Sequence, residues 1–114
     1  MTAMKERQLQ RKVVSRLKAM DGVKVFNVHG SAMTQAGTPD LICCVHGRFL
    51  GLELKVGRNQ PSPIQLVRLR EYEAAGGFCG VAWSVEDVDQ ILLDLEAQAR
   101  TDARLYPHLT ESLD

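Results

Sequence analysis

Hydrophobic positions recur with helical spacing near both ends of the chain. Residues 3–20 have apolar side chains three or four positions apart, which is typical of one face of an α-helix. These positions are Leu9, Val13, Leu17 and Met20. Glu6 lies one turn before Leu9 and in line with this stripe, so its side chain should point toward the protein body rather than toward solvent.

The last third of the chain shows the same spacing after Ser84, which we expect to cap a helix. Its predicted buried stripe consists of Val85, Val88, Ile91, Leu92 and Leu95. Beyond about residue 100 the periodicity fades. We therefore place a single domain over residues 1–100 and a loosely packed C-terminal tail over residues 101–114.

Shorter apolar runs in the middle of the chain predict strands over residues 23–28, 40–45, 48–56 and 78–83. The short connection at His46-Gly47 predicts a hairpin between the second and third of these strands. The segment 29–39 is rich in small residues, with Gly37 and Pro39 near its end, and is predicted to be a loop.

A helix is predicted to begin at Ser62-Pro63, with serine as the N-cap and proline at the first helical position. Gln65 follows three residues after the cap, which is the spacing of a capping box. Gly76-Gly77 should end this helix. The resulting order is helix, three strands, helix, strand, helix, which predicts an α/β domain with helices packed on one mixed sheet.

The length of 114 residues fits one domain. The formal net charge of zero removes the simplest argument for nucleic-acid binding, which is a strongly basic balance. Such binding is not excluded, because a neutral chain can still cluster its charges. Acidic residues gather in the last third, whereas cations crowd the N-terminal segment: Lys5, Arg7, Arg11, Lys12, Arg16 and Lys18.

The cysteines give no sign of a zinc site. Cys43 and Cys44 are adjacent in a predicted strand, so their side chains point to opposite faces, and Cys79 is isolated. We expect all three to be buried, reduced thiols of a cytoplasmic protein. No apolar run approaches the ~18 residues that a membrane span requires, and the charged N-terminus does not resemble a signal peptide.

Charged residues interrupt the predicted hairpin in a way that suggests a site. Alternation along residues 48–56 puts Glu53 and Lys55 on the same face, opposite a leucine-rich face that belongs to the core. If the turn pairs Val45 with Arg48, it carries Asp40 to the level of Glu53. Two carboxylates and an ammonium group then converge, and a slip of one residue in the register would separate them.

Two carboxylates at close range repel, and each raises the pKa of the other. A hard cation such as Mg²⁺ resolves that repulsion, because it prefers oxygen ligands. A bound metal lowers the pKa of a water molecule and polarises a phosphoryl oxygen. Lys55 could orient or deprotonate the water, or stabilise charge on the phosphate, and Glu6 could join the carboxylates. These are the requirements of metal-assisted phosphodiester hydrolysis.

Each residue also has a simpler interpretation. Glu53 and Lys55 could be a solvated pair on an exposed sheet face, and Glu6 could serve only to complement the helix dipole. Gln65 could do no more than complete the capping box. Arg58, in the loop after Lys55, is either a phosphate contact or a solvated charge.

The motifs resemble a known nuclease family. Pro39-Asp40, twelve intervening residues and Glu53-Leu54-Lys55 are similar to the PD-(D/E)xK motif. The stretches G-T-P-D-L-I, G-R-F-L-G-L-E-L-K and S-P-I-Q resemble the VRR-NUC branch of that superfamily. The resemblance is close over residues 30–65 and extends to the order of elements over most of the chain.

The resemblance implies a restriction-endonuclease-like α/β core and a DNA endonuclease that depends on Mg²⁺ or Mn²⁺. It makes Asp40 and Glu53 metal ligands, joined by the backbone carbonyl of Leu54, and Lys55 the catalytic lysine. Two further catalytic positions would be Gln65 and Glu6, with Glu6 also a possible metal ligand. Contacts to DNA are expected from Arg58 and Ser62, the latter at a helix N-terminus, where phosphate binds readily.

The resemblance also suggests a homodimer from a phage or bacterium that cuts branched DNA such as Holliday junctions in the cytoplasm. A two-fold assembly would present two sites to a symmetric junction. Two alternatives stay open. One is a nicking or repair nuclease that acts on linear duplex or flap DNA, and the other is a catalytically silent DNA-binding module.

Overall fold

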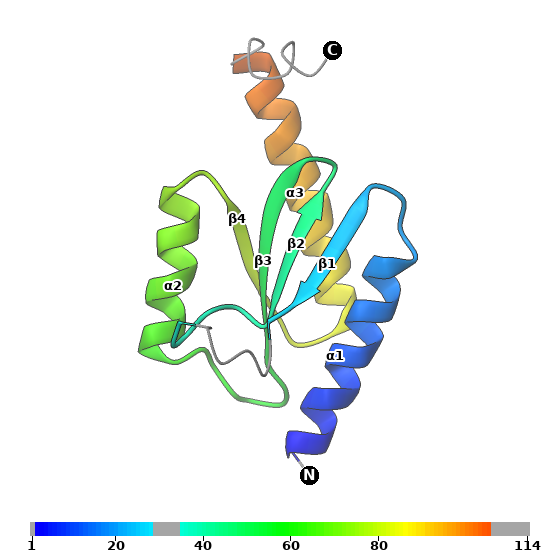
Figure 1. The fold of residues 1–114 in the computed structure, drawn as a ribbon, viewed down its shortest axis with the longest axis vertical. Helices are drawn as coiled ribbons and strands as arrows, with labels where there is room; N and C mark the ends of the chain where they lie inside the picture. Colours follow the sequence, from blue (N-terminus) through cyan, green and yellow to red (C-terminus); the bar gives the residue numbers. More distant parts are fainter. Residues whose placement is uncertain (1, 29–34, 106–114) are drawn as a thin grey trace.

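A four-stranded mixed sheet forms the centre of the protein (Figure 1). The computed structural model describes residues 2–28 and 35–105. Its elements follow the predicted order, and the predicted α/β class is confirmed. They are α1 (Thr2–Lys18), β1 (Val23–Asn27), β2 (Leu41–Val45), β3 (Arg48–Leu54), α2 (Pro63–Ala74), β4 (Phe78–Ala82) and α3 (Val85–Leu105).

The strands lie in the order β1-β2-β3-β4, with β3 and β4 parallel and the other neighbours antiparallel. The hairpin between β2 and β3 pairs Val45 with Arg48, as predicted. Its two turn residues both have positive φ, 50° at His46 and 83° at Gly47. Such angles characterise the tight turns that match the twist of paired strands, and a turn of this kind fixes the register.

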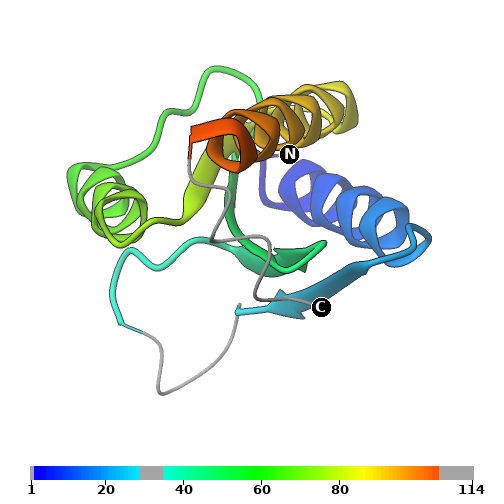
Figure 2. The same ribbon diagram turned by 90° about the horizontal axis from the view of Figure 1, so that it is seen from above.

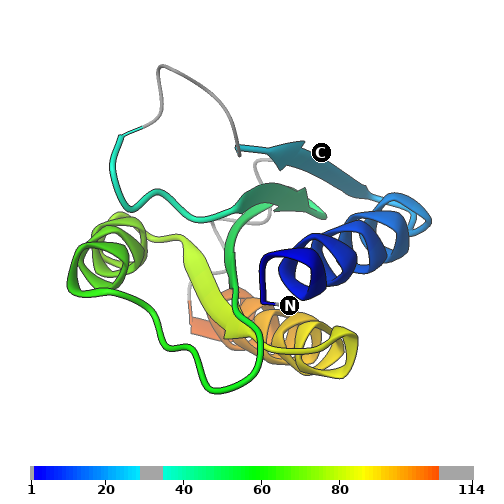
Figure 3. The same cartoon turned by 90° about the horizontal axis from the view of Figure 1, so that it is seen from below.

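Helices cover the two faces of the sheet unequally. α1 and α3 pack against each other and against one face, whereas α2 lies on the opposite face beside β4 (Figures 2 and 3). The core lies between the sheet and the α1–α3 layer. The alternating apolar residues of the hairpin are all buried in it, as predicted: Leu41, Cys43, Val45, Leu50, Leu52 and Leu54.

The stripe predicted along α1 is confirmed at Leu9, Val13 and Leu17, which are buried. Met20 is 38% exposed instead, because α1 ends at Lys18, two residues before it. Arg16 of α1 forms two hydrogen bonds to the carboxylate of Asp89 in α3, at 2.7 and 2.8 Å. This pair joins the two helices of the layer.

Some boundaries differ from those predicted. β2 begins at Leu41 and β3 ends at Leu54, so Asp40 and Lys55 flank the strands rather than lie within them. α3 continues past residue 100, where Asp102 pairs with Arg48 of β3. The boundary that we placed at residue 100 therefore lies inside this helix. Residues 29–34 of the predicted loop and residues 106–114 lie outside the described residues.

The prediction of three buried cysteines is confirmed only for Cys43 and was wrong for Cys44. All three thiols are free, but only Cys43 is buried, while Cys79 is half-buried and Cys44 is exposed. The side chain of Cys44 points to the sheet face that carries α2. Because α2 packs beside β4, it does not cover β2 on that face. Burial raises the pKa of the Cys43 and Cys79 thiols to about 11. No helix in the described part of the chain is both long and apolar enough to cross a membrane.

Candidate catalytic site

The hairpin brings Asp40 and Glu53 together at the end opposite its turn. Leu41 pairs with Leu52, so the next step of the same register places Asp40 level with Glu53. Asp40 is held there by a hydrogen bond of 2.8 Å, in which the backbone N–H of Leu54 donates to its Oδ2 atom. The convergence that depended on the register is therefore present in the structure.

Glu53 is the one buried charged residue in the part of the chain that the structure describes, with 1% of its surface exposed. Its Oε1 atom accepts a hydrogen bond of 3.0 Å from Nε2 of Gln65 and lies 3.8 Å from Nζ of Lys55. Its Oε2 atom is buried and has no hydrogen-bond partner. Since a buried carboxylate without partners is costly, this oxygen is suited to a cation.

Burial raises the pKa of Glu53, and the nearby carboxylate of Asp40 raises it further, to about 8. Lys55 acts in the opposite direction, and Glu6 adds a smaller upward effect. Without a cation, a pKa of about 8 favours the protonated form of Glu53 at neutral pH. The positive charge of a divalent cation would favour its ionised form instead.

Gln65 both completes the predicted capping box and contacts Glu53. The side-chain Oε1 atom of Gln65 accepts a hydrogen bond of 2.8 Å from the backbone N–H of Ser62. The backbone N–H of Gln65 donates to Oγ of Ser62 at 3.3 Å. This is the predicted capping box. The remaining donor, Nε2, reaches Glu53. The first turn of α2 is thereby fixed against the carboxylate, and the hydroxyl oxygen of Ser62 is an acceptor in the cap.

Lys55 directly follows Leu54, the last residue of β3. Its backbone N–H donates to the carbonyl of Ala82 at 2.9 Å, which extends the pairing with β4. The side chain is 15% exposed. The ammonium group therefore lies at the edge of the site, close to Glu53 and within reach of solvent. A solvated surface pair, the simpler interpretation from sequence, does not fit the burial of Glu53.

Glu6 is near this site but does not complete a set of ligands. Its side chain is half-buried, and its charge acts on Glu53. Among residues 2–28 and 35–105, however, no three side chains of histidine, cysteine, aspartate or glutamate gather closely enough to hold a metal ion. Within those residues the carboxylate ligands available are Asp40 and Glu53, and other ligands would come from backbone oxygen, as expected for Leu54, or from water.

Arg58 is exposed in the turn that follows β3, next to Gly57, which has a φ of 59°. The loop containing it is tied back at Asn59, whose carbonyl accepts a hydrogen bond of 2.8 Å from the indole of Trp83. This role of Trp83 was not predicted from the sequence. The one sequence signal for this contact was the position of Trp83 directly after the apolar residues of β4.

Two contacts that position Asp40 were also missed. The guanidinium of Arg68 in α2 donates to the carbonyl of Ala36 at 2.9 Å. Gly37 has a φ of 82°, and a Cβ atom there would lie 2.8 Å from the carbonyl oxygen of Ile64. The loop that leads to Pro39 and Asp40 is therefore pressed against the first turns of α2. The glycine in G-T-P-D was the signal for this close approach.

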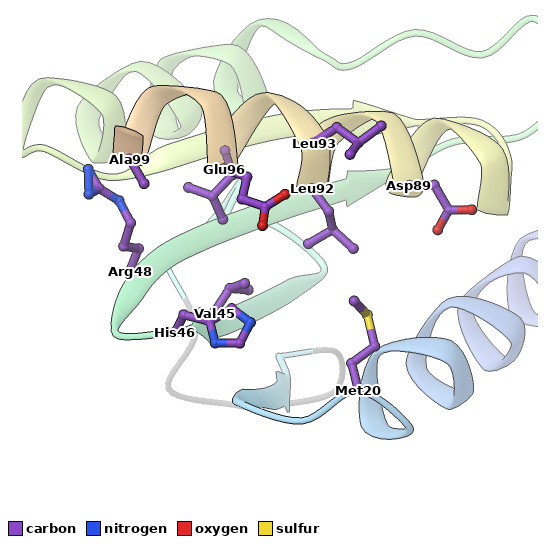
Figure 4. A pocket seen from close by; sticks show the side chains of 10 residues that line it. Met20, Val45, His46, Arg48, Asp89, Leu92, Leu93, Glu96 and Ala99 are labelled. Atoms are coloured by element: carbon purple, nitrogen blue, oxygen red, sulfur yellow. The ribbon is translucent and has the colours of Figure 1, made fainter. Parts of the chain in front are cut away.

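An apolar hollow of about 340 Å³ lies at the other end of the hairpin. It is lined by Met20, by Val45 and the turn residue His46, and by α3 residues that include Leu92 and Leu93 (Figure 4). None of the candidate catalytic residues lines it. The carboxylates instead lie beside the N-terminal ends of α1 and α2.

No family model matches the sequence, and no curated protein matches it. Among solved structures, the chain is similar to a VRR_NUC domain, with a TM-score of 0.66 and 27% identity over 77% of this chain and 94% of that one. A VRR_NUC domain protein has a TM-score of 0.60 and 23% identity, covering 77% of this chain and 84% of its own.

A Holliday junction resolvase from the archaeal hyperthermophile Archaeoglobus fulgidus has a TM-score of 0.52 and 18% identity, covering 68% of this chain and 67% of its own. At these lower identities, the resolvase and the second VRR_NUC protein demonstrate a shared fold. The 27% identity to the first structure extends over nearly all of that domain. The resemblance indicated by the motifs is thus confirmed: the chain is similar to VRR_NUC domains and has a restriction-endonuclease-like fold.

Proposed function

We propose that the protein is a divalent-metal-dependent endonuclease that hydrolyses phosphodiester bonds of DNA and prefers branched DNA. The observation that carries the proposal is the buried Glu53, whose unpartnered oxygen lies in a site shared with Asp40 and Lys55. The similarity to VRR_NUC domains supports a nuclease.

In this proposal Asp40, Glu53 and the carbonyl of Leu54 hold Mg²⁺ or Mn²⁺. The bound metal supplies a water of lowered pKa and positive charge toward the phosphate. Gln65 keeps Glu53 in place, and Asp40 is kept in place by the N–H of Leu54. Lys55 provides a second positive charge where negative charge develops on the phosphate, or orients the attacking water. Glu6 tunes the charge of the site from α1.

The catalytic part is tested by incubating a four-way junction with Mg²⁺ or Mn²⁺ and the wild-type protein or Lys55→Ala. We expect cleavage by the wild type and a large loss in the variant. Equal rates for the two proteins would refute the catalytic role of Lys55.

The preference for branched DNA rests on the similarity in fold to the archaeal resolvase. A panel of four-way junction, flap, nicked and linear duplex DNA at equal concentration tests it. Faster cutting of the junction is expected. Cleavage that is indifferent to branching would favour the nicking or repair nuclease instead, and binding without any cleavage would favour a silent module.

The proposal includes a homodimer, because a two-fold assembly presents two sites to a symmetric junction. The solution mass should be twice the 12.7 kDa of one chain. Light scattering after gel filtration measures it. A monomer at the concentrations used for cleavage would contradict the dimer.

A further inference from the structure

A basic groove runs between α1 and the edge strand β1. Its volume is about 730 Å³. Three cations line it from α1, namely Arg7, Arg11 and Lys18. They are four and seven residues apart, so they recur on one side of the helix. Polar side chains fill the space between them: Gln10, Ser15 and Asn27.

These cations have no acidic partner among residues 2–28 and 35–105, since no ion pair there includes Arg7, Arg11 or Lys18. By contrast, Arg16 is paired with Asp89 and Arg48 with Asp102. α1 carries a single acidic residue, Glu6. A chain of zero net charge thus has a locally positive groove, and that charge is available to an anion.

The groove begins next to the candidate catalytic site. Arg7 follows Glu6, whose charge reaches Glu53. On the other wall, Asn27 is held by Gln10 through a hydrogen bond of 3.0 Å. The next residue, Val28, donates its backbone N–H to the carbonyl of Asp40 at 3.0 Å. Both walls therefore end beside a residue of the site.

The dimensions suit a nucleic-acid backbone. From Arg7 to Lys18 the helix rises ~17 Å at ~1.5 Å per residue. One strand of a duplex places a phosphate every ~3.4 Å along its axis, so this length corresponds to about five phosphates. Arginine, lysine, serine and the side-chain amides are the groups that commonly contact phosphate and sugar.

We infer that this groove binds the sugar–phosphate backbone of one arm of a DNA substrate as it leaves the catalytic site. The inference rests on the proposed nuclease function and extends it, because it assigns a surface that the sequence motifs do not include. The contacts are to the backbone, so they do not select a sequence. They hold an arm in line with Asp40 and Glu53.

The test compares two double variants of the full-length chain with the same loss of charge. Arg7→Gln/Arg11→Gln removes two cations from the groove. Arg100→Gln/Arg104→Gln removes two exposed cations from the far end of α3 and serves as the control. Fluorescence anisotropy of a labelled four-way junction, in EDTA and at several salt concentrations, measures affinity. Thermal unfolding verifies that each variant is folded.

We expect the groove variant to bind at least ~10-fold more weakly at 0.1 M salt, and its slope of log affinity against log salt to be smaller by about two. The control should keep the wild-type slope. In Mg²⁺, the groove variant should need more DNA for half-maximal cleavage while its maximal rate stays within about threefold of the wild type, since no reacting group is altered.

Equal salt slopes in the two double variants would overturn the inference, even if the wild type cleaves DNA. Binding that depends on the groove without any cleavage would leave the inference standing and refute the proposed activity. A wild type that binds no DNA in EDTA or in Mg²⁺ would overturn both. The charge reversal Arg11→Glu gives an independent check, with a larger loss of affinity expected than for Arg11→Gln.

Discussion

Gln65 donates a hydrogen bond of 3.0 Å to the buried carboxylate of Glu53 while its own carbonyl oxygen caps the helix that carries it. The side-chain amide of Gln65 thus links the first turn of α2 to Glu53 in the candidate site. Because Glu53 has so little contact with solvent, its orientation depends on such partners. Replacing a residue that orients a metal ligand commonly costs about 10–100-fold in metal affinity or activity.

We expect Gln65→Ala to lower the maximal cleavage rate by roughly 10–100-fold, since Glu53 loses the donor that orients it. Ser62→Ala is the matched control, because it breaks the same capping box but leaves the bond between Gln65 and Glu53 possible. Each variant should lose about 1 kcal/mol of stability through the cap. Cleavage at saturating DNA and urea unfolding measure the two effects. If Ser62→Ala slowed cleavage equally, the cap rather than the hydrogen bond would position Glu53.

The raised pKa of Glu53 predicts a metal-free stability that falls as the pH rises. Its pKa is about 8 in the folded state against 4.5 as the ordinary value. Between these values the folded protein binds a proton that the unfolded chain has released, so the free energy of unfolding decreases with pH. The stabilisation is complete below pH 4.5 and is lost as the pH passes about 8. The total is of the order of a few kcal/mol.

Urea unfolding in EDTA from pH 5 to pH 9 measures this dependence. The variant Glu53→Gln has no proton to release, so its stability should change much less over that range. The raised pKa of Cys43 and Cys79, about 11 against the ordinary 9.0, lowers stability only near pH 9 and above, and this effect is common to both proteins. A wild type and a Glu53→Gln variant with parallel pH profiles would show that Glu53 titrates normally.

Metal binding should release a proton and stabilise the protein, because the cation replaces the proton that Glu53 holds. Calorimetry with Mn²⁺ at pH 7 in buffers of different ionisation enthalpy measures the proton release. At a concentration of metal ~100 times the dissociation constant, stability should rise by about 2.7 kcal/mol. Asp40→Asn should bind at least ~10-fold more weakly. Unchanged binding in this variant would exclude Asp40 as a ligand.

Much of the site was predictable because its geometry is set locally. A two-residue turn at His46-Gly47 fixes the register, and the alternation along β3 then decides which face Glu53 occupies. The spacing of Ser62 and Gln65 likewise revealed the capping box. These features depend on residues close together in the chain, which a sequence pattern records directly.

Other features depend on packing between distant segments. The exposure of Cys44 follows from the position of α2, which lies beside β4 and leaves β2 open. No pattern within β2 indicates that Cys44 is exposed. The hydrogen bond from Arg68 to Ala36 joins residues 32 positions apart, and nothing in the sequence around Arg68 distinguishes it from a solvated surface arginine. Such contacts are decided by how the layers meet, not by local propensity.

The close approach at Gly37 gives a last prediction. Gly37 and Gly47 have nearly the same φ, 82° and 83°. A Cβ atom at Gly47 would meet no atom within 4 Å, whereas one at Gly37 would lie 2.8 Å from the carbonyl oxygen of Ile64. Gly47→Ala therefore reports the cost of the backbone conformation alone, roughly 1–2 kcal/mol. Gly37→Ala adds a clash with the backbone of α2.

We expect Gly37→Ala to be less stable than Gly47→Ala by ~1 kcal/mol or more, and to lose cleavage activity in addition, because the loop that carries Asp40 must move away from α2. Urea unfolding gives the first difference, and cleavage rates below the unfolding transition give the second. Wild-type cleavage by a destabilised Gly37→Ala would mean that the hydrogen bonds of Asp40 to Leu54 and Val28 hold it without help from the loop. Equal stability of the two variants would mean that the loop shifts without cost.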